Sequence, residues 1–214
     1  MSSTPPPRFG VIVPVKPPAV AKSRLAPLGD AVRRDLVVAF AVDTVTAVLE
    51  APVVGEVLVV TDDHLLARGL ADLGVRVLPD GATDDLNGSL VQAAAELHRR
   101  RPDLSPVALC ADLPALRTEE LTRALAEAGR HDVAFVADAQ GVGTTLVTAR
   151  HLDGFAPRFG AGSRAAHLDA GAHEVTAGDV PSLRRDVDTP ADLDAAIALG
   201  VGSRTGILTT ALRL

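Results

Sequence analysis

The chain has 214 residues, a net charge of −6 at pH 7 and 47% hydrophobic residues, and its five aromatic residues are all Phe. The acidic balance argues against a general nucleic-acid binder, because proteins that neutralise phosphates carry a basic patch or stripe. No apolar segment reaches the roughly 20 residues that span a bilayer, and the polar start of the chain lacks the features of a secretory signal. We therefore expect a soluble, cytoplasmic protein with neither nucleic acid nor a membrane among its partners.

In chain order, apolar strands alternate with helices. Strands are predicted over residues 9–15, 56–61, 75–78, 106–111, 132–137, 144–148, 174–176 and 183–187. Helices are predicted over residues 30–50, 62–73, 89–100, 118–128 and 190–200, and a short helix is predicted in the Gly-rich stretch 155–171. Such βαβ units in series imply an α/β fold: one domain with a mostly parallel, twisted sheet flanked by helices. The domain is predicted over residues 9–200, between a flexible N-terminal tail of residues 1–8 and a loosely held C-terminal tail of residues 201–214.

The two lysines of the chain lie close together after the first strand. Ligands of parallel α/β sheets bind beyond the carboxyl ends of the strands, which is where Lys16, Lys22 and Arg24 fall. Lys is a compact charge and Arg a bidentate fork, and both suit the phosphates of a nucleotide. A solvated basic loop is the alternative for the same residues. The loop lacks both the P-loop pattern and the glycine fingerprint of dinucleotide-binding folds, which disfavours P-loop enzymes and nicotinamide dehydrogenases.

Two further turns place carboxylates at the same edge of the sheet. Asp112 follows a wholly apolar strand, and Asp188 lies just before the helix that Thr189 caps and Pro190 begins. A hard divalent cation such as Mg²⁺ is held by one or two carboxylates plus substrate phosphates. We therefore predict a Mg²⁺ site formed by Asp112 and Asp188, with Asp186 as the substitute for Asp188.

Two polar segments are candidates for contacts with substrates. Residues 160–163, with the sequence Gly-Ala-Gly-Ser, lead into a predicted helix, whose N-terminal N–H groups favour an anion and whose glycines allow close approach. Arg164 either adds a cation there or points to solvent. Asp85 and Asn87 follow the third strand, where the Asn87 amide suits a purine edge and capping of the next helix is the equal alternative.

The remaining reactive residue types show no catalytic pattern. The six histidines have no metal-ligand spacing and are expected at the surface. Cys110 lies in an apolar strand and is expected to be an inert core thiol, and a lone cysteine excludes an internal disulfide. No Ser-His-Asp or Cys-His constellation is evident.

Six segments in this order are similar to those of a known family. They are Pro14–Lys16, Ala21–Leu25, Asp85–Asn87, Ala111–Leu116, Phe159–Ser163 and Asp186–Pro190. Over residues 9–200 the chain resembles the guanylyltransferases of coenzyme F420 biosynthesis, which comprise the 2-phospho-L-lactate guanylyltransferases and their bacterial relatives that use phosphoenolpyruvate. The resemblance implies a nucleotidyltransferase fold similar to that of molybdenum-cofactor guanylyltransferases, with GTP as the donor and Mg²⁺ as the cofactor.

The same resemblance implies where the substrates bind. The acceptor, phosphoenolpyruvate or 2-phospho-L-lactate, would contact Thr145, Gly160 and Ser163. From their places after the strands, we predict that Lys16, Asp85 and Asn87 contact the nucleotide.

A mechanism follows from these assignments. An acceptor that carries its own phosphate needs no general base, so catalysis would rest on alignment and neutralisation of charge. Asp112 would hold the metal against the α-phosphate of GTP, while Lys22 and Arg24 would neutralise charge on that phosphate and on the leaving pyrophosphate. Two alternatives stay open: a nucleotidyltransferase for a sugar phosphate or molybdopterin, and a non-catalytic GTP-binding module. Monomer and homodimer also remain open.

Overall fold

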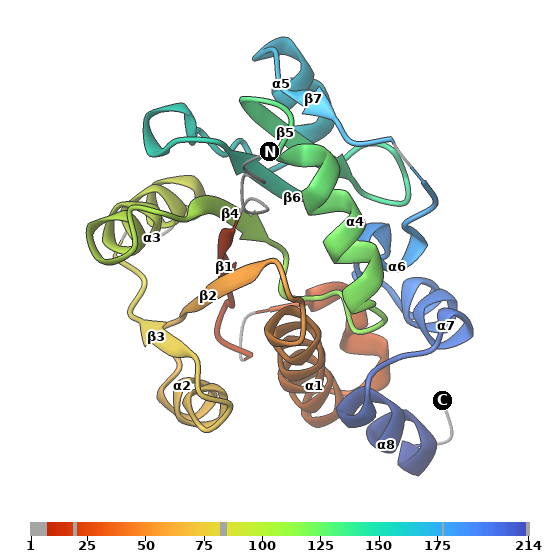
Figure 1. The fold of residues 1–214 in the computed structure, drawn as a ribbon. Helices are drawn as coiled ribbons and strands as arrows, with labels where there is room; N and C mark the ends of the chain where they lie inside the picture. Colours follow the sequence, from red (N-terminus) through yellow and green to blue (C-terminus); the bar gives the residue numbers. More distant parts are fainter. Residues whose placement is uncertain (1–7, 19–20, 82–84, 177, 213–214) are drawn as a thin grey trace.

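The computed structural model describes residues 8–18, 21–81, 85–176 and 178–212. At their centre is a seven-stranded sheet in the order β3-β2-β1-β4-β6-β5-β7 (Figure 1). The strands are β1 (Phe9–Pro14), β2 (Val54–Val60), β3 (Arg76–Leu78), β4 (Ser105–Leu109), β5 (Val133–Ala137), β6 (Thr144–Ala149) and β7 (His173–Glu174). The strand β6 runs antiparallel to both neighbours, and all other neighbouring strands are parallel. The predicted, mostly parallel sheet is confirmed, with one reversed strand.

Helices cover both faces of the sheet, which explains why its strands are apolar on both sides. The helices α1 (Asp30–Leu49), α2 (His64–Ala71) and α4 (Thr118–Ala128) pack on one face, and α3 (Leu86–Arg100) packs on the other (Figure 1). Along β1, Val11 and Val13 join the core beneath α1 and α4, whereas Ile12 joins the core beneath α3. Because both faces are covered, a ligand reaches the sheet at the ends of its strands.

The remaining elements are short and lie mostly in the second half of the chain. They are the 3₁₀ helices η1 (Ser23–Leu28) and η2 (Leu152–Gly154), and the α-helices α5 (Ser163–Asp169), α6 (Pro181–Arg184), α7 (Pro190–Leu199) and α8 (Ser203–Leu212). The start of α7 is as predicted, with Thr189 as N-cap and a capping box completed by Asp192. The strand predicted at residues 183–187 is wrong. Glu120 accepts hydrogen bonds from both the N–H and the hydroxyl of Ser182, and the chain turns through α6 there instead.

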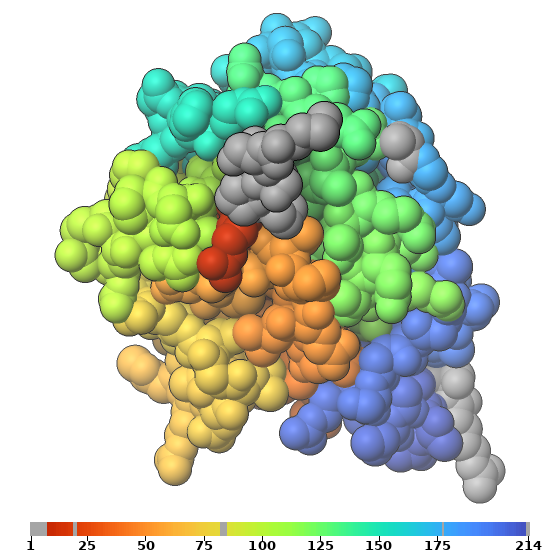
Figure 2. All heavy atoms as spheres, viewed as in Figure 1, coloured from red at the N-terminus to blue at the C-terminus, as the bar shows by residue number. Residues whose placement is uncertain are grey.

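The C-terminal segment also differs from the prediction. Residues 203–212, expected to be loosely held, form α8 and pack against α1. The buried carboxylate of Asp43 in α1 accepts hydrogen bonds from the N–H groups of Arg204 and Thr205, where a negative charge complements the helix dipole. Figure 2 shows this blue segment as part of the continuous surface of the molecule. No single described helix is long and apolar enough to cross a bilayer; α7 and α8 reach that length and composition only as a pair bent by 120°.

Candidate active site

A cavity of about 390 Å³ lies at the carboxyl ends of β1 and β4. It is lined by residues 14–16 at the end of β1, residues 21–24 around the start of η1, residues 110–112 after β4, and Asp188. Phe40 of α1 and Leu86 of α3 add apolar surface. The cavity therefore brings together the loop with both lysines and the turn with the predicted metal ligand.

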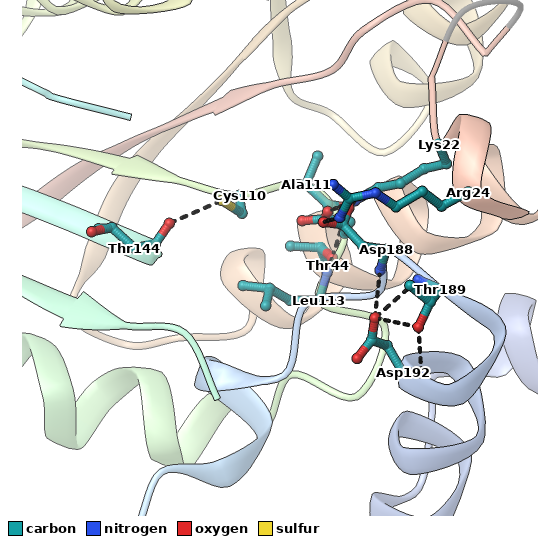
Figure 3. A network of polar contacts seen from close by, with 11 residues as sticks. Lys22, Arg24, Thr44, Cys110, Ala111, Leu113, Thr144, Asp188, Thr189 and Asp192 are labelled. Carbon is teal, nitrogen blue, oxygen red and sulfur yellow. Dashed lines mark hydrogen bonds and ion pairs between the residues drawn. The ribbon is translucent and has the colours of Figure 1, made fainter. Parts of the chain in front are cut away.

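Three carboxylates, Asp112, Asp186 and Asp188, meet beyond the end of β4 and form what we call the aspartate cluster. One oxygen of each lies within 4.8 Å of the others, close enough for one cation to bridge them. The two turns are joined directly, because the N–H of Val187 donates to the carbonyl of Asp112 at 3.1 Å. The hydroxyl of Thr44 in α1 bonds the carbonyl before Asp112 and the N–H after it, both at 3.1 Å (Figure 3). Asp112 and Asp188 thus lie together, and Asp186 joins Asp188 rather than replacing it.

The ammonium of Lys22 lies between two of these carboxylates (Figure 3). It contacts Asp112 and is 2.6 Å from Oδ1 of Asp188. The largely exposed Arg24 reaches toward the same aspartate, with Nη1 at 3.6 Å from Oδ2. The backbone of Lys22 is left-handed, with φ of 55°, which is uncommon for a residue other than glycine. The loop after β1 therefore carries its positive charge directly into the aspartate cluster.

These contacts shift the protonation equilibria of the site. Burial lowers the pKa of Lys22, but the charges of Asp112 and Asp188 outweigh burial and hold that pKa above its usual value. Burial raises the pKa of Asp186 to about 7, and the negative charge of Asp112 adds to the effect. The positive charge of Lys22 and Arg24 does not balance the three carboxylates if all of them are ionised. A divalent cation bound there would favour the ionised form of Asp186.

The glycine loop, residues 158–163, leads into α5 and is held by two side chains. The N–H of Arg158 donates to Nε2 of His167 at 3.1 Å. The N–H of Phe159 donates to Oδ1 of Asn87 at 2.9 Å, and Nδ2 of Asn87 donates back to the Phe159 carbonyl at 3.0 Å. Two consecutive peptides are therefore fixed immediately before the first glycine.

The rest of the glycine loop has a backbone that only glycine adopts easily. Gly160 has φ of 141° and Gly162 has φ of 67°. Ser163 follows as the first residue of α5, and its side chain is buried. The predicted arrangement of a Gly-rich turn leading into a helix is confirmed.

Thr145 lies at an irregularity in β6. Successive residues of β5 pair with Leu146 and Thr144, so Thr145 has no partner in that strand. On its other side, its carbonyl accepts the N–H of Cys110 at 2.8 Å. Its hydroxyl is buried and, within the part of the chain that the structure describes, makes no hydrogen bond. Bulges near active sites re-aim side chains, and a buried hydroxyl without a partner is a group that a ligand can satisfy.

Sequence similarity to known proteins extends over almost the whole length of this chain. Residues 9–213 match the family described as guanylyl transferase CofC like. The chain belongs to that family. The phosphoenolpyruvate guanylyltransferase of Thermomonospora curvata is 51% identical over 94% of this chain and 88% of its own length. That of Streptomyces scabiei is 51% identical over 92% of this chain and 94% of its own.

A solved structure supports the fold of this CofC-like chain. It is that of a protein from Desulfovibrio desulfuricans G20 described as a nucleotide-diphospho-sugar transferase, with a TM-score of 0.72 and coverage of 96% of both chains. The sequence identity is 20%, so the likeness concerns the fold alone. It agrees with the nucleotidyltransferase fold that the sequence predicts.

Some polar residues of the CofC-like chain have partners that the sequence did not indicate. Asp85, not Asn87, caps α3, since its Oδ1 accepts the N–H of Gly88 at 2.9 Å. Arg164 forms an ion pair with Glu174 at 2.8 Å. Thr44 donates a hydrogen bond to a backbone carbonyl 67 residues away, and Asn87 donates one to a carbonyl 72 residues away. No local sequence pattern reveals such partners.

The surface location predicted for all six histidines is wrong for one of them. The side chain of His167 is only 1% exposed, and burial lowers its pKa. Cys110 lies just after β4 rather than within it, and its thiol donates to the carbonyl of Thr144 at 3.5 Å. Burial raises the pKa of the Cys110 thiol well above its usual value, which disfavours a reactive thiolate. The predicted core position is wrong, because Cys110 is only partly buried and lines the cavity.

Proposed function

We propose that this chain transfers GMP from GTP to phosphoenolpyruvate and releases pyrophosphate, as a step of coenzyme F420 biosynthesis. The observation that carries the proposal is the aspartate cluster, with Lys22 inside it, at the carboxyl end of β4 in a chain of the CofC-like family. The names of the relatives from Thermomonospora and Streptomyces favour phosphoenolpyruvate over 2-phospho-L-lactate as the acceptor.

We propose Mg²⁺ as the cation of the aspartate cluster. Three carboxylates from two turns offer the hard oxygen ligands that Mg²⁺ prefers, within reach of a single ion. When bound, Mg²⁺ would polarise the phosphates of GTP and neutralise charge that develops on them. The role of Asp112, Asp186 and Asp188 is to fix that ion at the carboxyl end of β4.

Lys22 and Arg24 are the candidates for contacts with the triphosphate. Both line the cavity, and Lys22 already lies where the metal ligands converge. Positive charge here stabilises the α-phosphate during attack and the pyrophosphate as it leaves. A phosphate oxygen of the acceptor forms the new bond to the α-phosphorus, and the bond to the bridging oxygen of pyrophosphate breaks. The attacking oxygen is already anionic, so no protein base is required.

The glycine loop and β6 are the candidates for the acceptor site. The N–H groups of Ser163 and Arg164 already bond the carbonyls of Gly160 and Val142. The support for an acceptor site is therefore the positive φ of Gly160 and Gly162, where the absent side chains let an anion approach the backbone, and the unpartnered hydroxyl of Thr145, which can donate a hydrogen bond. Ser163, the first residue of α5, is the third candidate for contacts with the acceptor. Lys16 lines the cavity, and Asp85 precedes the cavity-lining Leu86, so both stay candidates for nucleotide contacts.

A pyrophosphate-release assay tests this function. Each of GTP, ATP, CTP and UTP is combined with phosphoenolpyruvate, 2-phospho-L-lactate or a sugar phosphate in the presence of Mg²⁺. We expect turnover with GTP and phosphoenolpyruvate, and we expect Asp112→Asn to lower kcat about 100-fold or more, since a metal ligand supplies several kcal/mol. The matched control is Asp132→Asn, whose carboxylate is 94% exposed at the surface. Release with a sugar phosphate alone would point to a sugar nucleotidyltransferase, and GTP binding without release to a binding module.

A further inference from the structure

We propose that His167 and Asn87 are positioning residues that hold the glycine loop in the shape that receives the acceptor. The inference rests on the proposed function for the identity of that acceptor. Neither residue belongs to the aspartate cluster, and the polar atoms of both face the protein itself. In this proposal the amide of Asn87 binds the backbone of Phe159 and not, as the sequence suggested, a purine base.

His167 is buried within α5 and bonded at both ring nitrogens. Its ring stacks on Phe135 of β5, with centroids 5.3 Å apart, and meets the edge of Phe159 at 6.1 Å. Because Nε2 accepts the N–H of Arg158, it carries no proton, so the proton of the neutral ring is on Nδ1. That nitrogen lies 3.0 Å from Oγ1 of Thr144. The ring therefore ties the glycine loop to β6, next to its bulge.

Asn87 holds the next peptide of the loop from α3. Its amide has one accepting and one donating end, and the pair of bonds to Phe159 uses both of them. Two helices, α5 and α3, thus bind two successive peptide groups. The segment before Gly160 is attached to the body of the protein at both of its residues.

This attachment matters because the loop itself supplies little restraint: a hydrogen bond from the N–H of Ser163 to the carbonyl of Gly160, at 3.2 Å, spans its glycines. Glycine reaches the backbone conformations of Gly160 and Gly162 easily, but it reaches many others as well. Anchoring the peptides on one side, and starting α5 at Ser163 on the other, limits the freedom of the two glycines. An anion site that is ordered in advance loses less entropy when the acceptor binds. The expected effect of losing the anchors is therefore weaker acceptor binding.

Two substitutions of His167 distinguish the roles of its two ring nitrogens. In His167→Gln, Oε1 can take the place of Nε2 and accept the N–H of Arg158. In His167→Asn, the shorter amide can reach the position of Nδ1 and bond Thr144, but it leaves the Arg158 N–H without an acceptor. We expect His167→Asn to raise the KM for the acceptor about tenfold, with the KM for GTP and kcat within about threefold of wild type. His167→Gln should restore most of the acceptor KM.

Asn87→Ala tests the second anchor, and His98→Asn is the control, since that histidine lies exposed on α3. Asn87→Ala should also raise the acceptor KM selectively, and the double variant should cost less than the product of the single effects, because both act on one loop. A rise of both KM values together, or a lower melting temperature with unchanged KM values, would show that the two residues serve the fold only.

Hydrogen–deuterium exchange of residues 158–163 gives a readout that does not depend on turnover. Faster exchange in His167→Asn than in His167→Gln supports the anchoring, and equal exchange in both overturns it. If the wild-type protein releases no pyrophosphate with any acceptor, the proposed function fails while the exchange result still decides whether the loop is anchored.

Discussion

The aspartate cluster and the glycine loop differ in what holds them together. The cluster is charged, and its contacts are ion pairs between side chains from separate loops. The glycine loop is held by hydrogen bonds between its backbone and neutral side chains, two donated by backbone N–H groups and one by the amide of Asn87. Ion pairs change when a new cation arrives, whereas these hydrogen bonds fix one shape. One half of the site is therefore suited to an exchange of charges, and the other half presents a surface that is already in place.

The aspartate cluster contains more negative than positive groups. Lys22 and Arg24 are the cations paired to it among the described residues, while three carboxylates converge there. The raised pKa of Asp186, about 7, reflects its burial and the nearby charge of Asp112. Lys22 is therefore the residue whose removal should disturb the cluster most.

The largest effect is expected from Lys22→Met. It keeps most of the side-chain volume but removes the charge, so kcat/KM should fall about 100- to 1,000-fold, as for loss of one preorganised group that stabilises the transition state. Without Lys22 the carboxylates repel one another, and Mg²⁺ should raise the melting temperature of the variant more than that of wild type. Thermal melts with and without Mg²⁺, beside the pyrophosphate assay, measure both effects.

Lys22→Arg is the matched control for charge. It should respond to Mg²⁺ much as wild type does, yet it should not regain full activity, because the planar fork cannot replace a compact ammonium between two carboxylates. Equal stabilisation of wild type and Lys22→Met by Mg²⁺ would contradict the role given to this charge.

A smaller, more selective effect is expected in the glycine loop. Gly160→Ala places a side chain at φ of 141°, where L-residues are strained by roughly 1–3 kcal/mol. The loop should shift, raising the KM for the acceptor about tenfold while leaving the KM for GTP nearly unchanged. Gly69→Ala is the control, since Gly69 lies inside α2 with open space around it. That change should stabilise the protein by about 0.5–1 kcal/mol. Equal changes in both KM values for Gly160→Ala would contradict a separate acceptor loop.

The position of the aspartate cluster could be predicted because it depends on residues that are neighbours in the sequence. A carboxylate directly after an apolar strand must lie at the carboxyl edge of a parallel sheet, which places Asp112, and Thr189 with Pro190 marks the turn that holds Asp188. The parallel pairing of β1 with β2 and with β4 was expected from the same alternation of strands and helices. These features needed only neighbouring residues to be recognised.

The features that sequence reasoning missed depend on distant partners. The helix α8 contains one Gly and three Thr residues, which form helices poorly, yet Asp43 supplies two hydrogen bonds to its first turn from 161 and 162 residues away. Burial of His167 follows from its bonds to a loop and a strand, and neither is visible in its own surroundings in the chain. Tertiary contacts decided these cases.

The smallest predicted effect concerns the pH dependence of folding through His167. Burial lowers its pKa in the folded protein below the ordinary value of 6.5, opposed by the backbone of Ser163 and reinforced by Arg158. Well above pH 6.5 the ring is neutral in both the folded and the unfolded state. At lower pH the unfolded chain binds the proton more readily than the folded protein does. The free energy of unfolding therefore falls on acidification, by at most about 1.4 kcal/mol per pH unit.

Urea unfolding of wild type and His167→Gln between about pH 7.5 and 5.5 isolates the contribution of His167, because Gln does not titrate. The wild-type protein should lose more stability than the variant. Parallel curves would mean that the proton reaches His167 as easily in the folded protein as in the unfolded one, and that the ring contributes no neutral anchor to the glycine loop.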